Sequence, residues 1–162
     1  MTVGVAYRIP GVGAVMVSDG RVTHDGVICT DSARKYVQCG PVVVLLSGTV
    51  DDTWRQLQDK APRTFSALRT ILADGDKFDW LAYDPRTDRL HAGGVHVVSA
   101  FSAIGSGSSL AIGALEVLPV PKTLEEAEAI ATRAVRAACR HHIECGGRIR
   151  SVIVPQKSAK NG

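Results

Sequence analysis

The chain has 162 residues, 45% of them hydrophobic and 22% charged, which predicts one soluble globular domain over residues 1–162. The formal net charge is only +3, and aromatic residues make up 5% without alternating with basic ones, which argues against nucleic-acid binding. No apolar run approaches the ~20 residues that span a bilayer, so we expect no membrane contact. Four irregularly spaced cysteines and an N-terminus without a signal-peptide pattern predict a cytoplasmic protein with reduced thiols.

Apolar runs and helical patterns follow one another along the chain. Strands are predicted over residues 2–8, 13–18, 27–29, 35–38, 41–46, 80–83, 90–93, 95–104 and 148–155. Helices are predicted over residues 51–59, 63–72, 108–115 and 124–139. Thr123 is suited to cap the last helix, and residues 156–162 form a polar tail that we expect to be flexible. Strands, then helices, then strands again predict two sheets covered by helices.

Thr2 becomes the first residue once Met1 is removed, and its side chain is small enough not to hinder that removal. A threonine at that position carries a nucleophile, its hydroxyl, and a base, its own α-amino group. The amine has an ordinary pKa of about 7.7–8.0, so it can accept the hydroxyl proton near neutral pH. A Met-Thr start is common, and the interpretation therefore depends on residues further along the chain.

Four short motifs occur in order: DGRVT at residues 19–23, RK at 34–35, SGTVDD at 47–52 and AIGSG at 103–107. With the N-terminal threonine, they resemble the proteasome β-subunit branch of the N-terminal nucleophile (Ntn) hydrolases, most closely bacterial HslV and its small proteasome-like relatives. Each motif alone is weak, and the order and spacing carry the resemblance over nearly the whole chain. The family implies an α+β fold, a four-layer α-β-β-α sandwich.

The resemblance assigns a role to each of five catalytic candidates. Thr2 matches the nucleophile, and Lys35 matches the cation that lowers the pKa of its hydroxyl. Asp19 matches the carboxylate that holds Lys35 in position. The backbone N–H of Gly48 matches the oxyanion donor. Ser106 matches the serine beside the threonine amine.

Further positions match the substrate-binding segments of the family. Arg21 and Thr23 fall in the segment that pairs with the substrate backbone, and the pocket positions carry small or apolar side chains. These side chains predict a preference for apolar residues on the acyl side of the cut bond. The candidate substrate-binding residues are Arg21, Val22, Thr23, Ala33, Leu46, Thr49 and Val50.

The chain also departs from the family pattern. His142 and Cys145 stand where many members have the aspartate and serine that support the threonine, and the stretch over residues 51–80 is shorter than the usual two long helices. Cys139, His142 and Cys145 invite a zinc interpretation, but a structural zinc site generally has four ligands. We therefore expect neither a metal nor a cofactor.

Three functions remain open. The resemblance favours a threonine endopeptidase in a self-compartmentalising homo-oligomeric ring, with stacked rings, peptide or unfolded-protein substrates and an AAA+ ATPase unfoldase as a candidate partner. The second is an amide hydrolase with the same chemistry and a small substrate. The third is a non-catalytic ring or scaffold subunit, against which the combination of Thr2, Asp19, Lys35 and Ser106 argues.

Overall fold

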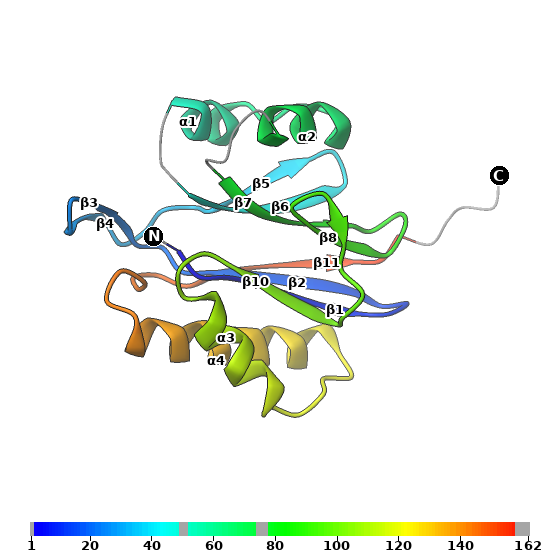
Figure 1. Ribbon diagram of the computed structural model, residues 1–162. Coiled ribbons are helices and arrows are strands. Elements are labelled where there is room, and N and C mark those ends of the chain that lie inside the picture. The colour runs from blue at the N-terminus through cyan, green and yellow to red at the C-terminus, as the bar shows by residue number, and fades with distance from the viewer. Residues whose placement is uncertain (1, 49–51, 74–77, 158–162) are drawn as a thin grey trace.

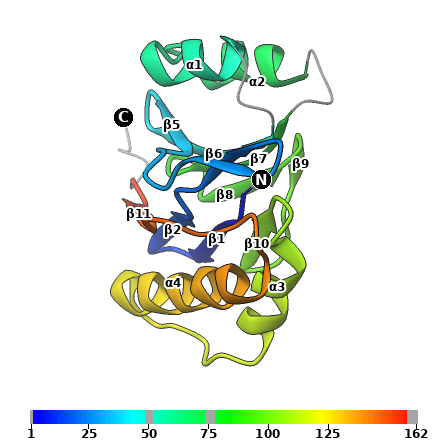
Figure 2. The same cartoon turned by 90° about the vertical axis from the view of Figure 1, so that its left-hand side faces the viewer.

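Two antiparallel β-sheets lie face to face, and helices cover both outer surfaces (Figures 1 and 2). The computed structural model describes residues 2–48, 52–73 and 78–157. Its strands are β1 (Gly4–Ile9), β2 (Gly13–Ser18), β3 (Val22–His24), β4 (Val27–Thr30), β5 (Tyr36–Cys39), β6 (Val42–Gly48), β7 (Phe78–Asp84), β8 (Arg89–Ala92), β9 (Val95–His96), β10 (Phe101–Ile104) and β11 (Arg150–Pro155). Its helices are α1 (Asp52–Asp59), α2 (Phe65–Ala73), α3 (Ser108–Glu116) and α4 (Leu124–His141). This mixture of antiparallel sheets and helices confirms the α+β class.

The strand order places the beginning and the end of the chain in one sheet. A four-stranded sheet has the order β10-β1-β2-β11, and a five-stranded sheet has the order β5-β6-β7-β8-β9. Strands β3 and β4 form a separate hairpin. The hairpin, the start of β1 and the connection from α4 to β11 lie at the same end of the molecule (Figure 1).

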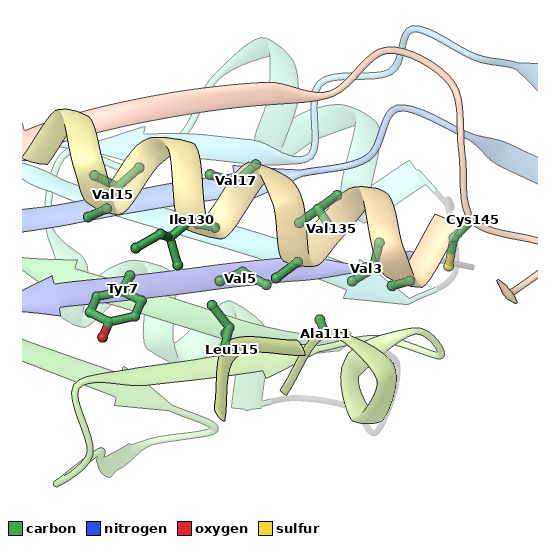
Figure 3. Packing of buried hydrophobic residues seen from close by; sticks show 14 of the residues in the cluster. Val3, Val5, Tyr7, Val15, Val17, Ala111, Leu115, Ile130, Val135 and Cys145 are labelled. Atoms are coloured by element: carbon green, nitrogen blue, oxygen red, sulfur yellow. The ribbon is translucent and has the colours of Figure 1, made fainter. Parts of the chain in front are cut away.

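Three layers of buried apolar side chains hold the elements together. Between the sheets lie residues such as Met16, Leu45 and Tyr83. Strands β1 and β2 pack their other face against α3 and α4, where Ile130 and Val135 of α4 lie over the valines of the strands (Figure 3). Helices α1 and α2 pack on the outer face of β5, β6 and β7. The burial of both faces explains why β2 is apolar at almost every position.

Helix α4 is explained by local signals in the sequence. The Thr123 hydroxyl accepts a hydrogen bond from the backbone N–H of Glu126 at 3.2 Å, which confirms the predicted cap. Its buried face is rich in alanine, and small side chains allow a helix to approach a sheet closely. The buried alanines are Ala127, Ala131, Ala134 and Ala138.

Two strand predictions differ from the structure. The strand predicted over residues 95–104 is wrong in its middle, because β9 lies at the edge of the five-stranded sheet and β10 at the edge of the four-stranded sheet. The chain crosses between the sheets there, and the mostly apolar sequence of residues 95–104 conceals that crossing. Strand β3 is not predicted, because three partly exposed residues show no alternation.

No helix within residues 2–48, 52–73 and 78–157 has the length and apolar character needed to cross a membrane.

Candidate active site

A cleft of about 1130 Å³ opens at the end of the molecule where β1 begins. Its walls come from the β3–β4 hairpin, the end of β6, helix α1, the loop before α3 and the turn after α4. Thr2, Lys35, Gly48 and Ser106 all line this cleft. Four of the five residues predicted to be catalytic are thus brought together from segments that are far apart in the sequence.

The fifth, Asp19, lies behind the cleft wall and binds Lys35. The Lys35 Nζ donates to Asp19 Oδ1 at 2.8 Å, and both residues are buried, with exposed fractions of 1% and 0%. The backbone N–H of Val3 donates to the same oxygen at 3.0 Å, and that of Gly146 donates to Oδ2 at 3.0 Å. A carboxylate with three donors is strongly fixed, and it fixes the ammonium in turn.

The strand pairing explains why these two residues meet. Asp19 directly follows β2, which runs antiparallel to β1 with Gly4 opposite Ser18. Asp19 therefore lies beside Val3 and donates its own N–H to the Val3 carbonyl at 3.1 Å. Lys35 directly precedes β5, and its carbonyl accepts a hydrogen bond from Leu46 of β6 at 2.8 Å. The ion pair thus joins the two sheets next to the first residues of β1.

Burial and the ion pair act on Lys35 in opposite directions. Burial penalises the charged ammonium and lowers the pKa of Lys35 from its ordinary value, and Asp19 opposes this shift. The net direction is downward. Lys35 and Thr2 line the same cleft. A buried ammonium without a full hydration shell can stabilise negative charge that develops on a nearby oxygen.

The loop before α3 fixes the backbone of Thr2. Thr2 is 3% exposed, and its carbonyl accepts long hydrogen bonds from the N–H of Gly107 at 3.3 Å and the hydroxyl of Ser106 at 3.5 Å. Gly105 has a φ of +85°, and a Cβ there would collide with the Thr2 carbonyl and lie 2.8 Å from the Ser47 Oγ. Only glycine fits this approach, which explains the Gly-Ser-Gly motif physically.

The oxyanion candidate Gly48 closes strand β6 with a φ of +139° and faces the cleft. Glycine is favoured in this backbone conformation, and the absence of a side chain leaves its peptide groups accessible. The predicted substrate residues Thr49 and Val50 come directly after it and lie outside the described residues.

The other predicted substrate residues divide into two groups. Val22 and Thr23 line the cleft. The Arg21 guanidinium instead binds the Asp31 carboxylate at 2.8 Å and the Ile143 carbonyl at 3.2 Å. Two more residues are not part of the cleft lining among the described residues: Ala33, whose N–H bonds to Gly20, and Leu46, which packs under helices α1 and α2.

The residues predicted to support the threonine occupy different places. Cys145 is buried, and its Sγ lies 3.8 Å from the Ser106 Oγ, close to the loop that holds Thr2. Burial raises the pKa of the Cys145 thiol, so the group stays neutral. His142 directly follows helix α4 as its C-cap, and its buried Nδ1 has no hydrogen-bond partner within the described part of the chain. Nor do three or more metal-ligating side chains gather anywhere in that part.

The cleft lining also includes polar residues that sequence reasoning does not identify as site residues, among them Ser47, Asp79 and Glu144. A signal for Asp79 is nevertheless present. Leu81 and Tyr83 of β7 face the core between the sheets, and Asp79 belongs to the same face because side chains alternate along a strand. A polar residue on the strand face that otherwise carries Leu81 and Tyr83 indicates a site.

Comparison with known proteins places the chain near proteasome subunits. No protein-family model matches it. It is 25% identical to proteasome subunit beta 2 of Korarchaeum cryptofilum over 99% of this chain and 94% of that protein. Among solved structures, Thiobacillus denitrificans BPH matches with a TM-score of 0.74 over 96% of this chain and 99% of that chain, at 21% identity. The first similarity spans almost the full length of both proteins, and the second is a similarity of fold.

Proposed function

We propose that the protein is an N-terminal threonine peptidase of the proteasome-like Ntn hydrolase type. The observation that carries the proposal is the position of Thr2, in a cleft that it shares with Lys35, Gly48 and Ser106 and beside the buried Asp19–Lys35 pair. The similarity to a proteasome subunit over nearly the full chain supports it. Buried charges are costly to keep, and such a pair next to a hydroxyl in a cleft is typical of catalytic sites.

The reaction begins once Met1 has been removed and the Thr2 amine is free. The amine takes the proton of the Thr2 hydroxyl, whose oxygen forms a bond to the peptide carbonyl carbon. Lys35 stabilises the negative charge on the attacking oxygen, and the Gly48 N–H stabilises the charge on the carbonyl oxygen. The tetrahedral intermediate collapses, and the leaving amine takes the proton from the Thr2 ammonium. Water then hydrolyses the ester and restores the hydroxyl.

The proposal includes assembly of identical chains into rings, stacked as in HslV, in the cytoplasm. Its support is the similarity to a protein named as a proteasome subunit. A chamber formed by such rings admits peptides or unfolded chains, and an AAA+ unfoldase is the partner that would supply them. Light scattering during gel filtration tests this part, since a monomer or dimer at micromolar concentration would contradict it.

Intact mass spectrometry with and without a peptide epoxyketone tests the chemistry. This probe forms a ring adduct only with a residue that has both a free amine and an adjacent hydroxyl. We expect loss of Met1 and one adduct per chain, mapped to Thr2 by peptide sequencing. A free Thr2 that never reacts, or a Met1 that is retained, would contradict the proposal and favour the scaffold function.

The alternative function, an amide hydrolase with a small substrate, differs from the peptidase in its oligomer size and in the length of the substrates that it cuts. It would give the same adduct at Thr2, but in a small oligomer, and it would not cut peptides of eight or more residues. Incubation with a mixture of such peptides therefore separates the two functions once the adduct has been found.

A further inference from the structure

The turn between α4 and β11 carries two contacts with the groups of the candidate site. The Gly146 N–H donates to Asp19 Oδ2 at 3.0 Å, and the Cys145 Sγ lies 3.8 Å from the Ser106 Oγ. The other oxygen of the same carboxylate binds the ammonium that lines the cleft. The position of this turn therefore affects both the buried ion pair and the loop that holds the proposed nucleophile.

A second ion pair clamps this turn against the base of the β3–β4 hairpin. The Arg21 Nε donates to Asp31 Oδ1 at 2.8 Å, and its Nη2 donates to Oδ2 at 3.4 Å. The remaining nitrogen, Nη1, donates to the Ile143 carbonyl at 3.2 Å. The guanidinium also lies against Gly146, where a Cβ would be only 2.8 Å from the Arg21 Cζ. One side chain thus contacts the turn near its beginning and near its end.

Backbone hydrogen bonds tie the same segments together. The N–H groups of Gly20 and Arg21 donate to the Gly146 carbonyl at 3.0 and 2.9 Å, and the Arg148 N–H donates to the Asp31 carbonyl at 2.6 Å. The ion pair and these backbone contacts therefore converge on Gly146. A displacement of the Arg21 side chain would disturb the residue whose N–H binds the buried carboxylate.

The two side chains of this second pair are not placed to touch a substrate. Among the described residues, neither Arg21 nor Asp31 lines the cleft. All three guanidinium nitrogens already donate to protein oxygens. The side chains are 22% and 49% exposed, and an ion pair that is accessible to this extent contributes little to stability. The structure therefore gives Arg21 a different task from the pairing with the substrate backbone that the sequence predicts.

We propose that Arg21 and Asp31 are positioning residues, which hold the turn so that the Gly146 N–H keeps the Asp19 carboxylate, and through it Lys35, in place. The inference rests on the proposed peptidase function and adds two residues that act on its site from outside the cleft. A carboxylate that is free to shift lets the ammonium move away from the oxygen that it stabilises. Such a change lowers the rate of the chemical step and leaves substrate binding unaltered.

The test measures how fast the epoxyketone adduct forms at increasing probe concentration. This separates the maximal rate, kinact, from the probe concentration that gives half of it, KI. Arg21→Met and Asp31→Asn should each lower kinact about tenfold with KI unaltered, since a displacement of about 1 Å can cost up to about 10²-fold. Arg21→Lys keeps the charge without the planar fork and should lie between. The double variant Arg21→Met/Asp31→Asn should be no slower than the slower single variant, because both substitutions break one interaction.

A matched control is available in the pair of Arg86 and Asp84. The Arg86 guanidinium also binds its carboxylate through two nitrogens, at 3.0 and 2.8 Å, and among the described residues neither partner lines the cleft. Arg86→Met should leave kinact unchanged. We expect the melting temperature to fall by less than about 4 °C in this variant and in Arg21→Met alike.

Hydrogen exchange at the Gly146 N–H observes the proposed link directly. Mass spectrometry with fragmentation resolves this amide, whose bond to Asp19 protects it from exchange. Exchange should be faster in Arg21→Met and Asp31→Asn than in the wild type and in Arg86→Met. Asp31→Asn provides the same test by itself if Arg21→Met does not fold.

The outcomes separate this inference from the proposed function. A wild-type kinact in Arg21→Met and Asp31→Asn overturns the inference alone, provided that the wild type forms its adduct at Thr2. A raised KI with an unchanged kinact would assign Arg21 to substrate binding, and it would also overturn the inference. So would an equal loss of rate in Arg86→Met, or unchanged exchange at Gly146. Absence of the adduct in the wild type overturns the proposed function and this inference together.

Discussion

An ion pair joins the two sheets at each end of the sandwich, and the two pairs differ in burial. Near the start of β1, Asp19 and Lys35 are 2.8 Å apart with side-chain exposures of 0% and 2%. At the other end of β1, Arg8 and Asp88 are 3.1 Å apart with exposures of 17% and 15%. Each pair also has a hydroxyl in its neighbourhood, Thr2 at the first end and Tyr83 at the second.

The two hydroxyls have neighbouring groups of opposite charge. The Tyr83 hydroxyl donates to Asp88 at 2.8 Å, and burial together with this carboxylate raises the pKa of Tyr83. That hydroxyl is held in its neutral form and closes the far end of the core. At the cleft the carboxylate is turned away and the ammonium of Lys35 lines the wall with Thr2. Under the proposed mechanism, the two ion pairs therefore act on their neighbouring hydroxyls in opposite ways.

Removing the hydroxyl at each end of the sandwich should produce the largest difference in adduct formation and peptide cleavage between the two ends. We expect Thr2→Ala to abolish epoxyketone adduct formation and peptide cleavage, because no other group supplies both amine and hydroxyl. The oligomer and the melting temperature should be retained. Tyr83→Phe is the matched change at the other end and should leave adduct formation intact. Peptide cleavage by Thr2→Ala at more than a trace would refute the mechanism.

Breaking each ion pair should separate catalysis from stability. Lys35→Ala leaves the Asp19 carboxylate buried without its cation, so we expect a loss of about 3–5 kcal/mol in the free energy of unfolding. Adduct formation should also slow about 10²–10³-fold. Asp88→Ala should cost about 1–3 kcal/mol and leave the adduct rate near that of the wild type. Urea unfolding measures the change in stability, and time-resolved mass spectrometry measures the adduct rate. Equal adduct rates in the two variants would contradict the different roles expected for the two ion pairs.

Glycine substitutions test how tightly Thr2 is held. Gly105 and Gly94 have similar φ values of +85° and +90°, but a Cβ at Gly94 meets only the end of Arg69 at 3.9 Å. Gly94→Ala should therefore cost only the backbone strain, about 1–2 kcal/mol. Gly105→Ala adds a collision with the Thr2 carbonyl, for which we expect a further loss of about 1–3 kcal/mol and slower adduct formation. Equal destabilisation by the two substitutions would show that the loop does not fix Thr2.

The smallest effect concerns pH. Since burial lowers the pKa of Lys35, the adduct rate should fall on the alkaline side at a pH below the ordinary lysine value of about 10.4. The free energy of unfolding should instead rise with pH. The unfolded chain holds this proton more tightly than the folded one, so stability rises with pH between the folded and the ordinary pKa. Unfolding of wild type and Lys35→Ala from about pH 7 to about pH 10.5 isolates the contribution, and a wild-type stability that falls relative to the variant would contradict the shift.

Sequence reasoning succeeds where information is local or carried by spacing. Capping at Thr123 and the alanine-rich face of α4 depend on neighbouring residues, and motif spacing identifies the residues that line the cleft around Thr2. It fails where the pairing of strands that are distant in the sequence determines the position of a residue. The crossing between β9 and β10 and the position of Asp79 beside Ser47 depend on sheet register, which no short motif encodes. Leu46 illustrates the same limit, because the face of β6 on which it lies points to the helices.

The hydrogen bonds that fix Asp19 and Thr2 have a consequence for protein synthesis. Their donors include Val3 near the first residue of the chain and Ser106, Gly107 and Gly146 far along it. Chains emerge from the ribosome N-terminus first. A growing chain therefore carries its threonine for most of translation without the groups that orient it. Under the proposed mechanism, reactivity towards neighbouring nascent polypeptides would be withheld until the last third of the chain has been made and has folded back onto the first strand.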